Sequence, residues 1–123
     1  MTGYYPYQYT APNATADFML PIPFMTVFDS MAAIQAKTGN IAGFHIESVD
    51  RMRYQIWLST GVNAYSWGEY VNINFFEPQP GMTRIIIESR PRGPQQAAYQ
   101  VHQYNVNAVY SYIIAMFSQP PVY

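Results

Sequence analysis

Between residues 44 and 90 the chain repeats one pattern, in which apolar and polar side chains alternate and a short turn segment follows. A period of two residues is typical of a strand with one buried face. The last turn segment, Pro78-Gln79-Pro80-Gly81, carries strong turn residues. Strands joined by such short turns are antiparallel. The pattern therefore predicts an antiparallel sheet, with strands at residues 44–49, 54–59, 67–76 and 82–90.

A helical pattern precedes this sheet. Pro23 suits a first helical turn because its missing N–H is not needed there, and Gly39 provides the stop. The apolar residues between them recur at helical spacing, namely Phe24, Val27, Phe28, Met31 and Ile34. We expect a helix over residues 23–38, preceded by a short edge strand at residues 16–20.

A second helix is predicted over residues 95–118. Its apolar stripe, expected to face the core, is Ala97, Val101, Tyr104, Ala108, Tyr112 and Met116. The predicted fold class is thus α+β, an antiparallel sheet of four to five strands with two helices on one face, in the order β-α-β-β-β-β-α. A chain of 123 residues is sufficient for one such domain. We place it at residues 15–118, between a Tyr/Pro-rich arm at residues 1–14 and a tail at residues 119–123.

The surface of this domain is poor in charge. Only 11% of the residues are Asp, Glu, Lys or Arg, whereas 17% are aromatic and twelve are tyrosine. The cores of protein interfaces lose charge and gain tyrosine in the same way. We therefore predict a non-enzymatic structural or accessory subunit, which binds copies of itself or a larger protein complex. The predicted interface residues are Tyr4, Tyr5, Tyr7 and Tyr9 of the arm, and Gln100, Gln103, Asn107, Tyr110 and Ser111 of the second helix.

Several short motifs together resemble a small α+β domain that recurs in bacterial proteins of unknown function. These motifs are Ile46-Glu47-Ser48-Val49-Asp50-Arg51, Ser59-Thr60-Gly61, Ser66-Trp67-Gly68-Glu69, Thr83-Arg84, Ser89-Arg90-Pro91 and Asn105-Val106. The resemblance implies helices packed on one face of an antiparallel sheet, and it implies no activity. The chain departs from that pattern by carrying Tyr, Gln and Asn in the last helix where charges usually occur, which favours assembly.

An alternative function is the binding of a small apolar, lipid-like molecule. A curved sheet against a long helix can enclose such a ligand, and seven methionines would make an adaptable lining. The segment Ser66-Trp67-Gly68-Glu69 suggests possible ligand contacts, with the Trp67 indole as a platform and Glu69 as a hydrogen-bond acceptor. The same segment also fits a plain strand start, with Gly68 at a bulge and Glu69 paired with an arginine across the sheet.

Other function classes have little support in the sequence. A net charge of −1 disfavours nucleic acid, although arginines interleaved with Trp57 and Tyr70 could form a base-stacking face. The two histidines, His45 and His102, would need a carboxylate such as Glu47 to form a metal site. No catalytic spacing and no glycine-rich phosphate loop is evident, so we expect neither catalytic residues nor a cofactor. No apolar run is long enough for a transmembrane segment and no signal peptide is evident, so we expect a cytoplasmic protein or one peripheral to a complex.

Overall fold

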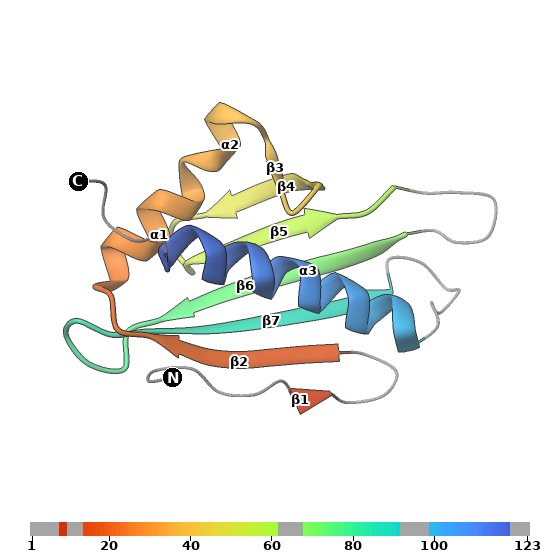
Figure 1. Cartoon of the computed structure of the whole chain (residues 1–123). Coiled ribbons are helices and arrows are strands. Elements are labelled where there is room, and N and C mark those ends of the chain that lie inside the picture. Colours follow the sequence, from red (N-terminus) through yellow and green to blue (C-terminus); the bar gives the residue numbers. More distant parts are fainter. Residues whose placement is uncertain (1–7, 10–13, 62–67, 92–98, 119–123) are drawn as a thin grey trace.

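The computed structural model describes residues 8–9, 14–61, 68–91 and 99–118. Within these residues, antiparallel strands form one sheet in the order β1-β2-β7-β6-β5-β4-β3 (Figure 1). The strands are β1 (Gln8–Tyr9), β2 (Ala14–Leu20), β3 (Asn40–Ile41), β4 (Phe44–Asp50), β5 (Gln55–Ser59), β6 (Glu69–Phe76) and β7 (Thr83–Pro91). The helices are α1 (Phe24–Ala32), α2 (Ile34–Lys37) and α3 (Tyr99–Phe117). The α+β class and the antiparallel sheet are therefore confirmed.

The sheet has more strands than the four to five predicted. The additional strands, β1 and β3, contain two residues each, which is too short to leave an alternating pattern in the sequence. β1 comes from the predicted arm and pairs with Ala14 and Thr15 of β2. The rest of the arm lies outside the described residues, as does the tail at residues 119–123. Residues 16–20 of β2 pair with β7 alone, as expected for an edge strand.

The predicted helix at residues 23–38 is divided into α1 and α2 at Ala33. The helical segment ends before Gly39, as expected. The backbone N–H groups of Thr38 and Gly39 both donate to the carbonyl oxygen of Ile34. Gly39 has a φ of 75°, a left-handed conformation that glycine adopts without steric cost.

The core lies between the helices and one face of the sheet. Alternate residues of the long strands point to this face, and both α1 and α3 pack on it (Figure 1). α3 lies across β2, β7 and β6, whereas α1 lies against the far end of β6. The fully buried strand residues include Phe18, Leu20, Ile56, Leu58, Ile73, Ile85 and Ile87.

The buried face of α3 differs from the predicted stripe. Val101 and Tyr104 were expected in the core, but they are 37% and 67% exposed. The buried face instead consists of His102, Asn105, Val106, Val109 and Ile113. Apolar residues occur on several sides of this helix, so their spacing alone does not identify the buried side. Polar residues of the sheet beneath the helix decide its orientation, as described below.

Candidate functional site

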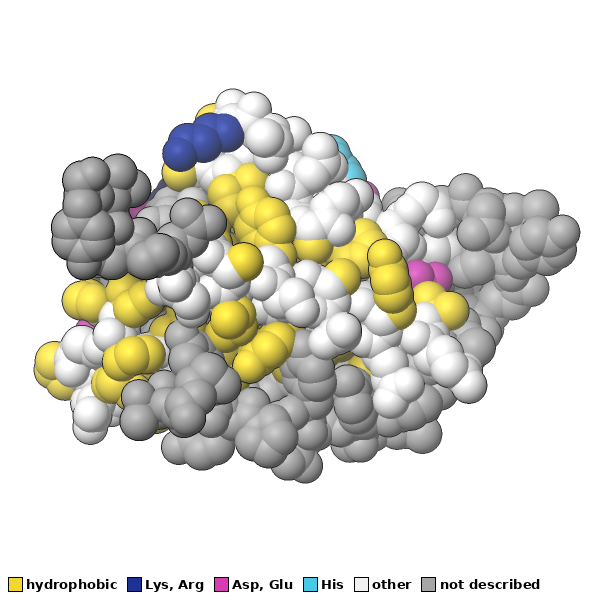
Figure 2. Space-filling view, in the orientation of Figure 1, with side chains coloured by type: hydrophobic (Ala, Val, Ile, Leu, Met, Phe, Trp, Pro, Cys, Tyr) yellow, Lys and Arg dark blue, Asp and Glu magenta, His cyan; other side chains and the backbone are white. Residues whose placement is uncertain are grey.

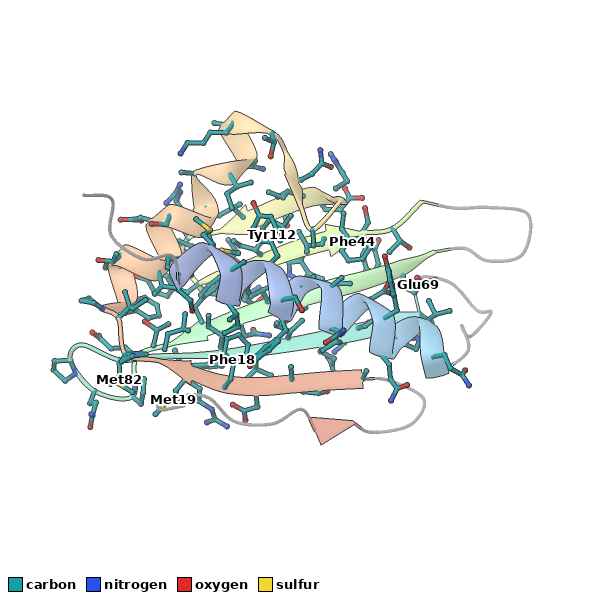
Figure 3. The ribbon with its side chains drawn as sticks, viewed as in Figure 1. Phe18, Met19, Phe44, Glu69, Met82 and Tyr112 are labelled. Carbon is teal, nitrogen blue, oxygen red and sulfur yellow. The ribbon has the colours of Figure 1, made fainter. Side chains whose placement is uncertain are left out.

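A cluster of buried polar side chains lies beneath the first half of α3. Its members are Glu69, the first residue of β6, Ser89 of β7, and His102 and Asn105 of α3. Positions three residues apart lie on the same side of a helix, so His102 and Asn105 reach the sheet together. Figure 3 shows Glu69 at the end of the sheet nearest the first turns of α3.

The hydrogen bonds of this cluster connect the helix to the sheet. The Asn105 amide donates to Glu69 Oε1 at 3.1 Å and to Ser89 Oγ at 3.2 Å, which uses both of its protons. Ser89 Oγ and His102 Nδ1 are hydrogen-bonded at 2.7 Å, with the donor set by the tautomer of the imidazole. The other ring nitrogen, Nε2, is buried without a hydrogen-bond partner. Glu69 is further fixed by Thr60, whose hydroxyl donates to Glu69 Oε1 at 3.2 Å and accepts the Glu69 backbone N–H at 2.7 Å.

The cluster has a structural role, because its groups are not accessible to a dissolved substrate. Burial lowers the pKa of His102, and the nearby Glu69 carboxylate opposes this effect only in part, so the imidazole is neutral at pH 7. Ser89 and His102 have no solvent-exposed surface, so a substrate in solution does not reach them. The cluster fixes the rotation and position of α3 on the sheet.

A second feature, which we call the aromatic pocket, lies where α1 begins and β6 ends. It has a volume of about 420 Å³. Its lining is mostly apolar, with one cation and one anion among the residues Phe24, Met25, Arg53, Tyr54, Phe75, Phe76 and Glu77.

Interlocked aromatic rings form the base of this pocket. The Tyr54 ring meets Phe24 and Phe28 edge to face, with centroid distances of 4.9 and 5.1 Å. Phe28 meets Phe75 in the same way at 5.2 Å. Edge-to-face geometry is the favoured arrangement of aromatic pairs, and each ring restricts its neighbours. The base of the pocket is therefore preformed.

Tyr54 has an unusual backbone conformation, with a φ of 56°. A bulky residue rarely adopts a positive φ, and such strain concentrates at functional positions. The conformation is held on both sides. Asp50 accepts the backbone N–H groups of Met52 and Arg53 at 2.9 Å each, and these bonds lower the pKa of its carboxyl group. The Phe75 N–H donates to the Tyr54 carbonyl at 3.1 Å. In this conformation the Tyr54 side chain lines the pocket.

The predicted interface residues whose side chains the structure describes lie on α3 and differ in exposure. Gln100, Asn107 and Ser111 are exposed on the outer face of α3, and Gln103 is half-buried. Tyr110 is also half-buried, with its ring 4.7 Å from that of Phe18, edge to face. Tyr4, Tyr5, Tyr7 and Trp67 lie outside the described residues, and for Tyr9 only the backbone is described.

The two histidines lie apart, and of the two predicted ligand contacts only Glu69 is among the described residues. Glu69 faces α3 and lies opposite Pro91 in β7. His45 is exposed on β4, while His102 is buried beneath α3. In the described parts of the chain, no three His, Asp or Glu side chains come together as a metal would require. None of the helices described there has the length and apolarity needed to cross a membrane.

The sequence analysis missed the polar cluster and the aromatic pocket. One feature of the sequence could have indicated that His102 and Asn105 act together, namely their spacing of three residues within a predicted helix. The pocket residues come from segments far apart in the chain, and the positive φ of Tyr54 leaves no mark in the sequence.

No protein-family model and no curated protein matches this chain. Among solved structures, the crystal structure of Ara h 8.0201 is similar, with a TM-score of 0.54 and 13% sequence identity. The match covers 84% of this chain and 97% of that one. At this identity the similarity concerns the fold, a long helix packed across an antiparallel sheet.

Proposed function

We propose that the protein binds a small, mostly apolar molecule in the aromatic pocket. The observation that supports this most directly is a preformed aromatic base beneath an open pocket of about 420 Å³. Small-molecule sites are concave, mainly apolar and typically ~300–1,000 Å³ in volume. Met25 and Phe76 at this pocket are 47% and 46% exposed, so a bound ligand would cover apolar surface that now faces water.

The polar residues of the pocket limit the chemistry of the ligand. Arg53 and Glu77 are both exposed and carry opposite charges. Arg53 offers a donor and Glu77 an acceptor, and the Arg53 guanidinium also lies 4.0 Å from the Asp50 carboxylate. The ligand we propose has an aromatic or aliphatic body, which covers Tyr54 and Phe76, and one polar group that stays near these two side chains.

Fluorescence titration with N-phenyl-1-naphthylamine, an apolar dye, tests the proposal. We expect saturable binding by the full chain. Phe76→Ser and Met25→Ser remove partly exposed side chains, so both variants should still fold. Each should weaken binding by about 1–2 kcal/mol, or roughly 5- to 30-fold, because the dye loses apolar contact area.

Met52→Ser is the matched control. Met52 is an exposed methionine on the neighbouring turn and is not part of the pocket lining. Dye binding should be unchanged in this variant. Equal loss of affinity in Met52→Ser and Met25→Ser would show non-specific adsorption, and absence of saturable binding would contradict the proposal.

Assembly through α3 is the second candidate function. One observation favours it: the outer face of α3 is exposed and contains no Asp, Glu, Lys or Arg (Figure 2). Its exposed residues include Gln100, Val101, Tyr104, Asn107 and Ser111. A neutral amide face is buried against a partner at lower desolvation cost than a charged one.

Light scattering coupled to size exclusion tests the assembly. If the chain self-associates through α3, Asn107→Lys and Ser111→Lys should lower its solution mass, because each buries a charge in the contact. Gln79→Lys, in the exposed turn after β6, is the control and should not change the mass. A monomer of 14.1 kDa for the unmodified chain would exclude self-association.

A further inference from the structure

The face of the sheet that points away from the helices carries a separate pocket, which we call the outer-face pocket. It has a volume of about 270 Å³ and is lined by Glu47, Ser48, Trp57 and Tyr70. Neighbouring residues in these strands, such as Ile56 and Val71, point to the core, so the alternation of the strands directs Trp57 and Tyr70 outward. None of its lining residues belongs to the aromatic pocket.

A β-bulge shapes one side of the outer-face pocket. Ile46 pairs with Leu58 and Ser48 pairs with Trp57, so Glu47 is an extra residue in β4. Bulges redirect side chains and are enriched next to functional sites. Here the bulge places two successive polar side chains, Glu47 and Ser48, beside the same indole. The Glu47 carboxylate is oriented by the hydroxyl of Ser59, which donates to Oε1 at 2.7 Å.

The aromatic side chains of this pocket form a platform. Trp57 and Tyr70 lie edge to face, with centroids 6.0 Å apart and planes at 85°. Both are half-buried, so each ring is anchored in the sheet while part of its surface remains exposed.

Asn72 lies beside the platform at a buried position. It lies opposite Trp57 in the sheet register and follows Tyr70 on the same face of β6. Its Oδ1 accepts a hydrogen bond from the Asn74 amide, but its own Nδ2 has no partner although the residue is only 5% exposed. This nitrogen has essentially no accessible surface, so it is not counted among the ligand contacts.

The arginines that the structure describes on this face are paired with carboxylates. Arg84 Nε donates to Asp17 Oδ1 at 2.9 Å, and the carboxylate raises the pKa of the guanidinium. Arg90 is paired with Glu88 in the same strand. A polyanion such as nucleic acid would have to displace these carboxylates. The face therefore favours a neutral ligand, in contrast to the base-stacking face considered from the sequence.

From these features we infer that the outer-face pocket binds a neutral carbohydrate. A sugar ring has an apolar C–H face, which packs on an aromatic ring, and hydroxyl groups around its edge. Those hydroxyls find an acceptor in the exposed Glu47 carboxylate, which lines the pocket. This inference is independent of the function proposed for the aromatic pocket, because the two pockets lie in different parts of the sheet and share no residue.

An array of immobilised neutral oligosaccharides, acidic oligosaccharides and single-stranded DNA tests the inference. We expect the full chain to bind neutral members of the array. Trp57→Ala should weaken this binding about tenfold or more, and Glu47→Ala about fivefold, for loss of the platform and of an acceptor. Glu47 is exposed, so the second variant provides a test even if Trp57→Ala fails to fold.

Phe76→Ser is the control, because it alters the aromatic pocket alone and should leave glycan binding intact. The inference is overturned if no neutral oligosaccharide binds, if Glu47→Ala binds as well as the unmodified chain, or if acidic glycans or DNA bind in preference to neutral ones. Loss of dye binding in Phe76→Ser with unchanged glycan binding would separate the two sites.

Discussion

At the scale of single residues, the buried polar cluster shows how a few hydrogen bonds fix the position of a helix. Asn105 connects the Glu69 carboxylate to the Ser89 hydroxyl, and Ser89 connects Asn105 to His102. Each bond contributes little in net terms, but removing one partner leaves a desolvated polar group behind. The intact cluster therefore stabilises the observed placement of α3 on the sheet.

Ser89→Ala tests this view. The substitution leaves His102 Nδ1 buried without its partner, so the free energy of unfolding should fall by about 1–3 kcal/mol. Urea denaturation measures the change. Ser111→Ala, at an exposed position in α3, should alter stability by less than ~0.5 kcal/mol. Equal stabilities of the two variants would show that the hydrogen bond to His102 does not contribute to the free energy of unfolding.

The low pKa of His102 predicts a dependence of stability on pH. The unfolded chain binds a proton at His102 below its ordinary pKa of 6.5, whereas the folded chain binds it only at a lower pH. The unfolded state thus holds more protons in this interval, and stability rises with pH there. The contribution should be complete above about pH 6.5 and be lost as the pH falls through the folded pKa.

An NMR titration of the His102 ring in a His45→Gln background follows the group directly, since one histidine signal remains. Urea denaturation of the same variant, with and without His102→Gln, measures the linked change in stability. A His102 pKa at or above 6.5 would contradict the expected effect of burial.

At the scale of the elements, the sequence predicted those whose pattern is local. Ile56 and Leu58 point to the core and Trp57 points away, as their alternation indicates. The prediction failed for the buried side of α3, because Tyr104 and Val101 are apolar enough for a core while His102 and Asn105 are not. His102 and Asn105 face inward because Glu69 and Ser89 of the sheet lie beneath the helix. That arrangement depends on the tertiary structure and not on the local sequence.

Gly68 is an element boundary with a testable requirement. It precedes β6 with a φ of 86°, and a Cβ atom there would lie 2.9 Å from the Thr60 carbonyl oxygen. Gly81 has a similar φ of 82° but open space around it. Gly81→Ala should cost about 1–2 kcal/mol for the backbone conformation alone. Gly68→Ala should cost at least ~1 kcal/mol more, because the strand ends must also separate.

Thermal or urea denaturation of both variants provides the comparison. Similar losses for Gly68→Ala and Gly81→Ala would mean that the close contact with Thr60 relaxes freely and does not define the start of β6.

At the scale of the whole molecule, two helical units cover different parts of one sheet. α3 covers the half built from β2 and β7, with Phe18 beneath it (Figure 3), while the aromatic residues of α1 pack on the end of β6. Both pockets depend on this arrangement. The aromatic pocket forms where Phe24 of α1 and Phe75 of β6 come together. The outer-face pocket forms on strands that none of the described helices covers on that side. Neither juxtaposition is visible in the sequence, since each requires the register of the sheet.

Phe28 connects the fold to the aromatic pocket, and its replacement should affect both. The side chain is fully buried and contacts Tyr54 and Phe75 edge to face, with Arg51 5.9 Å from its ring centroid. Phe28→Ala should lower the free energy of unfolding by about 3–5 kcal/mol. Phe28→Leu retains most of the volume and should lose about 0.5–1.5 kcal/mol per missing ring contact.

Urea denaturation and dye titration of the same samples distinguish the two roles of Phe28. In Phe28→Leu, the folded protein should bind N-phenyl-1-naphthylamine more weakly, because the Tyr54 ring loses one of its two edge-to-face partners. Phe76→Ser should show the opposite profile, with dye affinity lost and stability nearly unchanged, since that side chain is partly exposed. If Phe28→Leu binds the dye as well as the unmodified chain, the ring cluster supports the fold without shaping the pocket.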